Sequence, residues 1–333
     1  MVNIMLTYNC NKNCSYCFAK GENERFPKEM SLDDFKLLLD WFKKQRIKKI
    51  SLLGGEPTTY SKFKEVMALL KKNGIEITLF TNGLFDSGLI STLDKGVIKS
   101  YMINYNPRRH YTKEEWALLN NNLKILRKDG FEVKLSYNVY KNNLDYQYIF
   151  DACEKYSISG VRFCLVNPNR DRTNEFLNFK DIKKLVPYVI KFVKESVKRN
   201  LKLELDCCLP LCVFNDKERL FMEKSCKRFS GLCSPACDIN PDLSVYRCLP
   251  MSSIKASNIL LFQDMKTLIS YFDAKTDELK WATESFPECK NCKYKLRKQC
   301  QGGCLAVKRY YNYKGEKLSE EKGGNNNLYK YKS

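Results

Sequence analysis

The feature that most restricts the fold is an alternation of strand-like and helix-like segments over residues 1–206. Apolar residues at helical spacing lie between short runs rich in β-branched and aromatic residues. These runs predict strands at 2–7, 49–53, 76–80, 99–104, 132–139 and 160–166, with a possible seventh at 201–205. Such alternation is typical of parallel strands joined by crossover helices, as in a partial or full β/α barrel. Functional residues are then expected on loops at the carboxyl ends of the strands.

Two helix starts are marked by capping sequences. Ser31-Leu-Asp-Asp34 and Thr112-Lys-Glu-Glu115 each precede apolar residues at helical spacing. A Ser or Thr followed three residues later by an acidic residue satisfies backbone N–H groups that the first helical turn leaves free. We therefore expect helices to begin directly after Ser31 and Thr112.

The character of the chain changes after Asp206. Eleven of the 16 cysteines lie between Cys207 and Cys304, and prolines interrupt the regular pattern there. Clustered cysteines in a long chain without a signal peptide more often bind metal than form disulfides. We expect a barrel domain over 1–206, a small cysteine-rich domain over 207–310 and a flexible tail over 311–333. The isolated Cys153 and Cys164 are interpreted as buried core residues.

Composition narrows the possible chemistry. Lys and Arg exceed Asp and Glu by 20, and His110 is the single histidine. One histidine disfavours Ser-His and Cys-His nucleophile systems and histidine-rich zinc sites. No apolar run reaches the roughly 18 residues that a membrane span needs, and the first residues lack a signal-peptide pattern. We expect a cytoplasmic protein with no membrane partner.

The first cysteine group directly follows the first predicted strand. Cys10, Cys14 and Cys17 have the spacing C-x3-C-x2-C. Three thiolates on one loop are too few for a closed all-cysteine cluster, which needs four ligands. One metal position would stay open for a substrate or cofactor. An open position of this kind also distinguishes catalytic zinc sites from structural ones. Zinc is less favoured here because no histidine lies near this loop in the sequence.

This spacing, with Tyr16 before the last cysteine, resembles the signature of the radical S-adenosylmethionine (radical SAM) superfamily. Gly54-Gly-Glu-Pro57 after the second strand and Thr81-Asn-Gly83 after the third resemble two further elements of that family. The resemblance implies a partial (β/α)6 TIM-like barrel in which the three cysteines hold a [4Fe–4S] cluster. The open iron would bind S-adenosylmethionine (SAM), and reductive cleavage would yield a 5′-deoxyadenosyl radical that abstracts hydrogen from a substrate.

The resemblance also implies contacts to SAM from the glycine-rich loops and the strand ends. The backbone of the second-strand loop and its acid are expected to meet the methionine ammonium group. The expected cofactor-binding residues are Tyr16, Gly54, Gly55, Glu56, Pro57, Thr81, Asn82, Asn104 and Asn138. Arg108 and Arg109 follow the fourth strand, where two guanidinium groups could bind a carboxylate or phosphate, or simply form a surface loop.

The carboxyl-terminal cysteines resemble the SPASM domain of many peptide-modifying radical SAM enzymes. Leu243 stands where that pattern has glycine, and we expect its turn to form less comfortably. The resemblance implies one auxiliary [4Fe–4S] cluster at Cys233, Cys248 and Cys304, with Cys226 as its fourth ligand, and another at Cys289, Cys292 and Cys300. The fourth ligand of the second is left open among Cys207, Cys208, Cys212 and Cys237, or is absent. A pair of zinc sites and a single auxiliary cluster remain as alternatives.

The resemblance implies an oxidoreductase that modifies a peptide or protein by oxidation, cross-linking, thioether formation or epimerisation. Such maturases act on ribosomal peptides (RiPPs). A thiol at the barrel mouth could return a hydrogen atom to a substrate radical, so Cys207, Cys208 and Cys212 are candidate catalytic residues, together with His110. The signature begins at residue 10, which predicts no leader-binding domain before the barrel and leaves a small-molecule dehydrogenase as the alternative.

The positive charge favours acidic partners, among them an acidic electron donor such as flavodoxin or ferredoxin. Lysines are spread over the predicted helices, which is typical of solvated faces. No RNA-recognition module is visible. A tRNA-modifying enzyme is therefore only a second alternative, and we do not expect a nucleic-acid partner.

Overall fold

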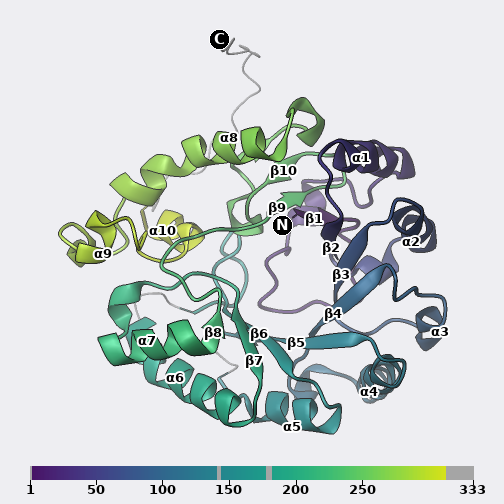
Figure 1. Ribbon diagram of the computed structural model, residues 1–333, viewed down its shortest axis with the longest axis horizontal. Coiled ribbons are helices and arrows are strands. Elements are labelled where there is room, and N and C mark those ends of the chain that lie inside the picture. The colour runs from purple at the N-terminus through teal and green to yellow at the C-terminus, as the bar shows by residue number, and fades with distance from the viewer. Residues whose placement is uncertain (1, 141–143, 178–181, 313–333) are drawn as a thin grey trace.

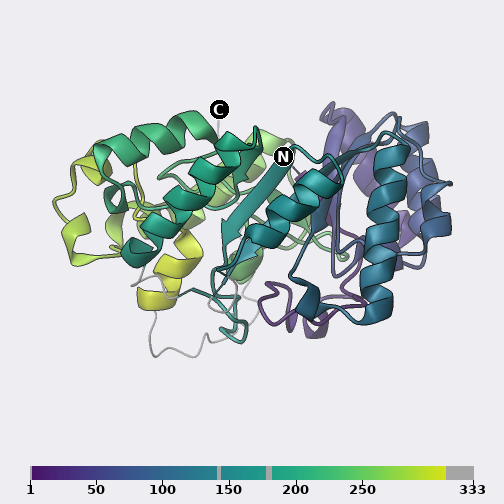
Figure 2. The same ribbon diagram turned by 90° about the horizontal axis from the view of Figure 1, so that it is seen from below.

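The computed structural model describes residues 2–140, 144–177 and 182–312. The tail expected at 311–333 lies outside these residues from position 313 onward. The fold is built on one eleven-stranded sheet in the order β11-β10-β9-β1-β2-β3-β4-β5-β6-β7-β8. The sheet curves, and most of the helices form a layer on its outer side (Figures 1 and 2).

The strands and helices have the following bounds. The strands are β1 (Val2–Met5), β2 (Lys49–Leu53), β3 (Glu76–Thr81), β4 (Ile98–Asn104), β5 (Glu132–Val139), β6 (Gly160–Leu165), β7 (Lys202–Leu205), β8 (Cys226–Lys227), β9 (Cys237–Ile239), β10 (Val245–Tyr246) and β11 (Lys255–Ala256). The helices are α1 (Leu32–Lys44), α2 (Phe63–Lys72), α3 (Ser87–Ile90), α4 (Lys113–Lys128), α5 (Gln147–Lys155), α6 (Ile182–Lys198), α7 (Asp216–Ser225), α8 (Met265–Asp277), α9 (Lys293–Leu296) and α10 (Leu305–Asn312).

The predicted parallel arrangement of the first seven strands is confirmed. Each of β1 to β7 pairs in parallel with the next strand along the chain, and the observed bounds differ from the predicted ones by at most two residues. The capping predictions hold as well. Ser31 Oγ accepts from the backbone N–H of Asp34 at 3.0 Å, and Thr112 and Glu115 form a reciprocal capping box at the start of α4.

The cysteine-rich segment extends this sheet at both edges. Strand β8 pairs in parallel with β7, and β9 pairs in parallel with β1, where Asn3 lies opposite Asp238. Strands β9 and β10 form a hairpin whose turn holds Leu243 at φ +61°, a conformation that L-residues adopt at a cost of about 1–2 kcal/mol. The expected turn therefore forms without its glycine. The division of the chain at residue 206 stays a prediction.

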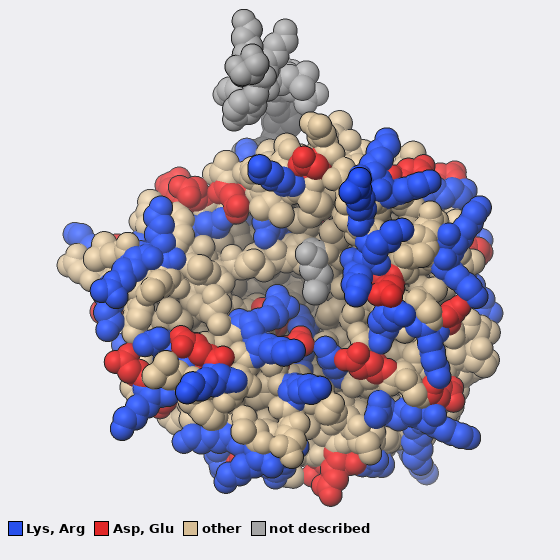
Figure 3. Space-filling view, viewed as in Figure 1, with Lys and Arg blue, Asp and Glu red and all other residues tan. Residues whose placement is uncertain are grey.

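Charged side chains cover the outer surface. Figure 3 shows Lys and Arg spread over the whole visible face, with acidic side chains between them. At the amino ends of the strands Glu76 pairs with Lys49 at 3.4 Å and with Lys99 at 3.3 Å. This distribution agrees with the expectation that most lysines lie on solvated faces. Within the described residues, no helix is both long enough and apolar enough to cross a membrane.

Candidate active site and auxiliary cysteine groups

A cavity of about 580 Å³ lies at the carboxyl ends of the strands. Its walls come from the loop after β1, the ends of β2 to β6 and the residue that follows β7. Of the predicted site residues it is lined by Cys10, Cys14, Tyr16, Cys17, Gly54, Gly55, Thr81, Asn82, Asn104 and Asn138. The structure therefore brings the three cysteines, both glycine-rich loops and the strand-end amides to one cavity, as parallel strands with a common carboxyl edge require.

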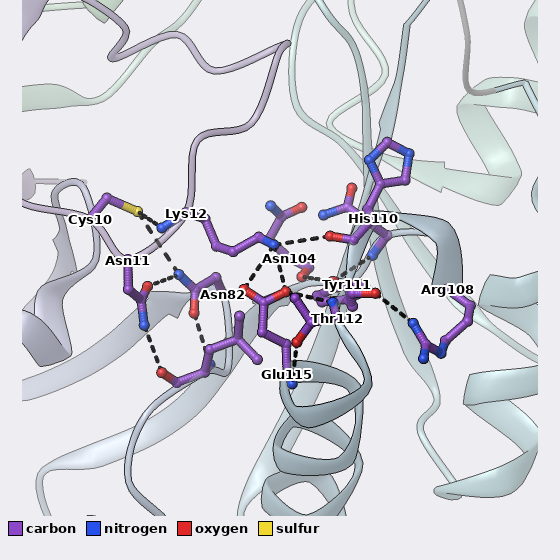
Figure 4. Close-up of polar contacts among 12 residues, drawn as sticks. Cys10, Asn11, Lys12, Asn82, Asn104, Arg108, His110, Tyr111, Thr112 and Glu115 are labelled. Atoms are coloured by element: carbon purple, nitrogen blue, oxygen red, sulfur yellow. Dashed lines mark hydrogen bonds and ion pairs between the residues drawn. The ribbon is translucent and has the colours of Figure 1, made fainter.

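The cysteine loop is anchored at two places (Figure 4). Lys12 Nζ donates to the backbone carbonyl of His110 at 2.9 Å and pairs with Glu115 Oε2 at 2.9 Å, which joins the loop to the start of α4. Asn82 Nδ2 donates to Asn11 Oδ1 at 2.7 Å and lies 3.9 Å from Cys10 Sγ. These contacts hold the loop between the ends of β3 and β4.

The three thiols fit an iron–sulfur cluster by their donor environment. The backbone N–H of Lys12 donates to Cys10 Sγ at 3.4 Å, Asn82 Nδ2 lies 3.9 Å from the same sulfur, and backbone N–H groups of Ala19 and Lys20 reach Cys17. Burial raises the pKa of all three thiols, that of Cys10 to about 11. The thiols are therefore protonated without metal, and cluster binding would release their protons while the hydrogen-bond donors stabilise the thiolates.

The glycines after β2 are required by the backbone of the cysteine loop. Gly55 N donates to Thr7 O at 2.7 Å, and Glu56 N donates to Asn9 O at 2.8 Å. A Cβ added at Gly54 would lie 2.3 Å from Thr7 O, and one at Gly55 would lie 2.2 Å from Asn9 O. No side chain fits between the two loops at these positions, so the glycine pair sets how closely the loop after β2 approaches the cysteines.

Glu56 is placed differently from the expectation. Its carboxylate is 1% exposed and accepts from the Thr58 hydroxyl, the Thr81 hydroxyl and the Asn82 backbone N–H, each at 2.7 Å. Burial raises its pKa even though these bonds favour the charged form. Neither Glu56 nor Pro57 lines the cavity. The geometry gives Glu56 a positioning role that joins the loop after β2 to the end of β3.

The ends of β4, β5 and β6 form a polar network on one side of the cavity. Tyr16 OH donates to Asn106 Oδ1 at 2.7 Å and accepts from Asn104 Nδ2 at 2.9 Å. Asn138 Nδ2 donates to Asn104 Oδ1 at 2.8 Å, and Cys164 Sγ donates to Asn138 Oδ1 at 3.0 Å. The aromatic residue of the cysteine loop thus orients the strand-end amides.

The lining residues that were not predicted from the sequence include Arg162, Cys164 and Asp206. Arg162 on β6 forms an ion pair with Asp206, and its guanidinium lies over the Phe80 ring at 5.2 Å. Cys164, interpreted from the sequence as a core cysteine, is buried and also lines the cavity. The available signal was the strand period, because Arg162 and Cys164 are two residues apart and share one face of β6.

The predicted candidates His110, Arg108, Cys207, Cys208 and Cys212 lie outside the cavity lining. The ring of His110 lies 3.3 Å from the Tyr140 hydroxyl, and its pKa is lowered by burial and by Arg109 and Lys12. Arg108 donates to Tyr111 O at 2.6 Å and lies over the Trp116 ring, which supports the surface-loop alternative for this arginine. Cys207 and Cys208 lie instead among the auxiliary cysteines.

The first auxiliary group contains five cysteines. Cys233, Cys248 and Cys304 line a cavity of about 40 Å³. Cys207 hydrogen-bonds Cys304, and the Cys208 thiol donates to Cys233 and helps to lower the pKa of Cys233 to about 7. The expected ligand Cys226 is not brought to this group: it is buried on β8, with its Sγ 3.6 Å from the Lys227 carbonyl. Cys207 and Cys208 are placed beside this group, where the family resemblance predicted Cys226.

The second auxiliary group contains Cys289, Cys292 and Cys300. Gly302 N donates to Cys300 Sγ at 3.3 Å, and a Cβ added at Gly302 would lie 3.6 Å from Cys289 Sγ. Among the described residues, no three Cys, His, Asp or Glu side chains are close enough together to hold a single metal ion. A four-iron cubane binds each thiolate at a different iron atom, so its ligands stand farther apart than those of one ion.

Part of the chain matches a known protein family. Residues 4–162 match the radical SAM superfamily, over the span that contains the cysteine loop and both glycine-rich loops. These residues carry a radical SAM domain. Among its radical SAM relatives, Fe-coproporphyrin III synthase of Methanosarcina barkeri is 25% identical over 211 residues, covering 60% of this chain and 53% of the relative. AdoMet-dependent heme synthase of Oleidesulfovibrio alaskensis is 24% identical over 172 residues, covering 49% and 44% respectively. The chain thus spans about half the length of these relatives.

Solved radical SAM structures share the fold. The crystal structure of Streptococcus suis SuiB bound to precursor peptide SuiA superposes with a TM-score of 0.66 at 17% identity, covering 92% of this chain and 71% of SuiB. SuiB bound to S-adenosylmethionine gives a TM-score of 0.63 with 72% of that chain covered. The likeness extends beyond the barrel into the cysteine-rich segment, so the fold of this radical SAM enzyme, a partial barrel followed by that segment, is shared as a whole.

Proposed function

We propose that this radical SAM enzyme modifies a residue in a peptide or protein, with a [4Fe–4S] cluster held by Cys10, Cys14 and Cys17. The observation that carries the proposal is the single cavity shared by these thiols, the loops after β2 and β3, and the amides at the ends of β4 and β5. When bound there, the cluster and SAM supply a 5′-deoxyadenosyl radical that removes a hydrogen atom from the substrate. The protein supplies binding, orientation and exclusion of water.

The chain's own groups suit these tasks. Backbone and side-chain donors reach Cys10 and Cys17, and the glycine pair brings the loop after β2 against the cysteine loop. Thr81 and Asn82 are held toward the cavity by Glu56. At the ends of β4 to β7, the Arg162–Asp206 pair and the Asn104–Asn138 network offer charged and amide groups to a substrate. A peptide bond presents the N–H and C=O groups that such amides recognise.

The size of the cavity favours a substrate that extends out of it. Ligand sites of roughly 300–1,000 Å³ hold one drug-sized molecule, and this one measures about 580 Å³. A nucleotide cofactor takes up much of that volume, which leaves space for about one side chain. The fold likeness to SuiB, whose structure was solved with a precursor peptide, supports a peptide as that substrate.

An acidic electron donor is the proposed partner, and it docks near the second auxiliary group. Between Cys289 and Cys300 the chain carries five basic residues and no acidic one. Lys290, Lys293, Arg297 and Lys298 are exposed, and Leu296 among them is 72% exposed. A basic surface around an exposed apolar side chain complements an acidic redox protein such as flavodoxin or ferredoxin.

The test has two parts. Reconstituted enzyme with dithionite and SAM should release 5′-deoxyadenosine, and changing Cys10, Cys14 and Cys17 together to Ala should abolish that release, whereas Cys153→Ala should not. Deuterated peptides encoded by neighbouring genes should then transfer deuterium to 5′-deoxyadenosine and show a mass change. Cleavage that survives the triple substitution contradicts the site. Deuterium transfer only from small molecules contradicts the peptide substrate.

A further inference from the structure

Cys212 lies beside the second auxiliary group rather than the first. It is carried by the short helix η5 (Leu211–Val213) in the loop after β7. The other cysteines left open by the sequence are placed elsewhere: Cys207 and Cys208 contact the first group, and Cys237 is buried on β9 opposite Val2. Of the four open thiols, Cys212 is the one whose pKa is affected by Cys289, Cys292 and Cys300.

Backbone contacts fix this placement. Leu209 N donates to Ser230 O at 3.1 Å, and Gln301 N donates to Gly231 O at 2.9 Å. Gly231 forms a parallel bridge with Cys300, and a Cβ added there would lie 2.8 Å from Leu211 Cγ and 3.0 Å from the Cys300 Cα. The residue directly before Cys212 thus packs against the same glycine as Cys300. Three segments far apart in the sequence are held together at this point.

The electrostatics of the thiols agree with the geometry. After burial, the groups that raise the pKa of Cys212, to about 11, are Cys300, Cys292 and Cys289. Each thiol would need to lose its proton to bind metal, and nearby positive charge favours that loss. The positive charge of Lys183 lowers the pKa of Cys212. Lys308 is 1% exposed and interacts electrostatically with Cys289 and Cys300, and its Nζ donates to the Leu279 carbonyl at 2.7 Å.

We propose that Cys212 is the fourth ligand of a second auxiliary [4Fe–4S] cluster at Cys289, Cys292 and Cys300. This inference rests on the proposed iron–sulfur chemistry of the chain. The fourth thiolate then comes from the loop after β7, upstream of the other three. Four cysteine ligands leave no iron open, so the cluster would transfer electrons and would not bind a substrate atom.

The decisive experiment measures iron without using enzyme activity. The background is the variant with Cys10, Cys14 and Cys17 changed to Ala, so that only auxiliary iron remains. This variant is expected to hold about 8 iron atoms after reconstitution, as two four-iron clusters require. Adding Cys212→Ala should remove between one and four of them, and the Mössbauer spectrum should show a three-iron cluster or the loss of one four-iron component. Adding Cys226→Ala should leave the count and the spectrum unchanged.

Two results overturn the inference. One is an unchanged iron count and spectrum after Cys212→Ala, and the other is a background variant that holds only about 4 iron atoms. Neither result touches the proposed function, which is tested separately by SAM cleavage in the wild-type enzyme. If wild-type SAM cleavage fails while Cys212→Ala still removes iron, the ligand assignment stands and the proposed reaction does not.

Thiol protection gives a second measurement that does not depend on how the variants fold. The Cys212 side chain is exposed to solvent in the structure. In the reconstituted wild-type protein, iodoacetamide should label Cys212 at least about 10-fold more slowly than in protein stripped with a chelator. An engineered thiol at the exposed Ser91 (Ser91→Cys) serves as the control and should be labelled equally in both forms. Equal labelling of Cys212 in both forms contradicts the assignment.

Discussion

Replacing Glu56 by Gln tests whether this residue positions the SAM site without touching SAM. The carboxylate accepts four hydrogen bonds, from the hydroxyls of Thr58 and Thr81 and from the backbone N–H groups of Thr58 and Asn82. A Gln amide offers one acceptor oxygen and one NH2 group. If the NH2 group faces Asn82, it opposes the Asn82 backbone N–H, and that N–H group loses its acceptor. If it faces Thr58, the Thr58 backbone N–H loses its acceptor while the hydroxyls turn.

Either orientation leaves one buried N–H group without a partner, which costs about 1–3 kcal/mol. The remaining bonds also lose their charge, which weakens each of them by up to about 1 kcal/mol, whereas removing a buried charge offsets part of the total. A net loss of about 2–3 kcal/mol follows. Unfolding entropy of about 2.1 cal/mol/K per residue predicts that 1 kcal/mol lowers the Tm of a chain this long by about 1.4 °C. Glu56→Gln should therefore lower the Tm by about 3–4 °C.

The assay compares thermal melts and SAM affinity of reconstituted Glu56→Gln and Glu65→Gln. Glu65 is an exposed residue of α2, so its substitution should change stability by less than about 0.5 kcal/mol. Glu56→Gln should also raise the Kd for SAM, because Thr81 and Asn82 lose their common anchor. Because burial raises the pKa of Glu56 in the folded protein, wild type gains stability as the pH falls through that pKa and Glu56→Gln does not, so the gap between them should widen. Melts within about 1 °C of each other and equal SAM affinities would refute the positioning role.

Three further predictions concern the glycine beside the cysteine loop, the buried Asp238 and the basic surface near the second auxiliary group. Gly55→Ala should reduce SAM cleavage at least about 10-fold, because its Cβ would lie 2.2 Å from Asn9 O. Gly88→Ala is the control and should leave cleavage unchanged, because its Cβ would meet nothing closer than 3.5 Å. Equal rates for the two variants would contradict the close approach of the two loops. Burial raises the pKa of Asp238 to about 7, so the folded protein holds a proton that the unfolded chain releases between about pH 4 and 7, and stability falls as the pH rises through this range. Asp238→Asn should therefore be more stable than wild type at pH 8 by about 2–4 kcal/mol in urea titrations, with the difference gone near pH 4, and a pH-independent difference would be the opposing result. Changing Lys290, Lys293, Arg297 and Lys298 together to Glu should slow flavodoxin-driven SAM cleavage about 10-fold at low salt and leave dithionite-driven cleavage unchanged. The charge-matched control changes four exposed lysines of α1 and α2 to Glu: Lys43, Lys44, Lys64 and Lys72. Equal slowing by both sets would count against docking at this surface.

The sequence predicted the barrel because its signals are local. Strand composition, helical spacing and the capping residues Ser31 and Thr112 act within a few neighbours along the chain, and the structure confirms the elements they predict. Parallel strands share one carboxyl edge, so the loops with Cys10, Gly54 and Thr81 had to meet there. The place of the candidate cofactor cavity, with its thiols, its two glycine-rich loops and the strand-end amides Asn104 and Asn138, could therefore be predicted.

The residues that the sequence missed depend on contacts between distant segments. Asn3 and Asp238, 235 positions apart, join β1 to β9 and carry the cysteine-rich segment back to the first strand. Arg162 finds Asp206 only because β6 and β7 lie side by side. Glu56 itself was predicted, but its four hydrogen-bond donors depend on the end of β3 lying beside the loop after β2.

The sorting of the auxiliary cysteines was likewise decided by tertiary structure. The family resemblance grouped three cysteines with each site and assigned Cys226 to the first, but it left Cys207, Cys208, Cys212 and Cys237 interchangeable for the second. Packing separated them: the loop after β7 brings Cys207 and Cys208 to the first group, and Gly231 brings Leu211 and Cys300 together beside Cys212. Local sequence determines which segments become strands, helices and ligand-bearing loops, whereas the choice among equivalent thiols depends on backbone contacts that form only when the whole sheet closes.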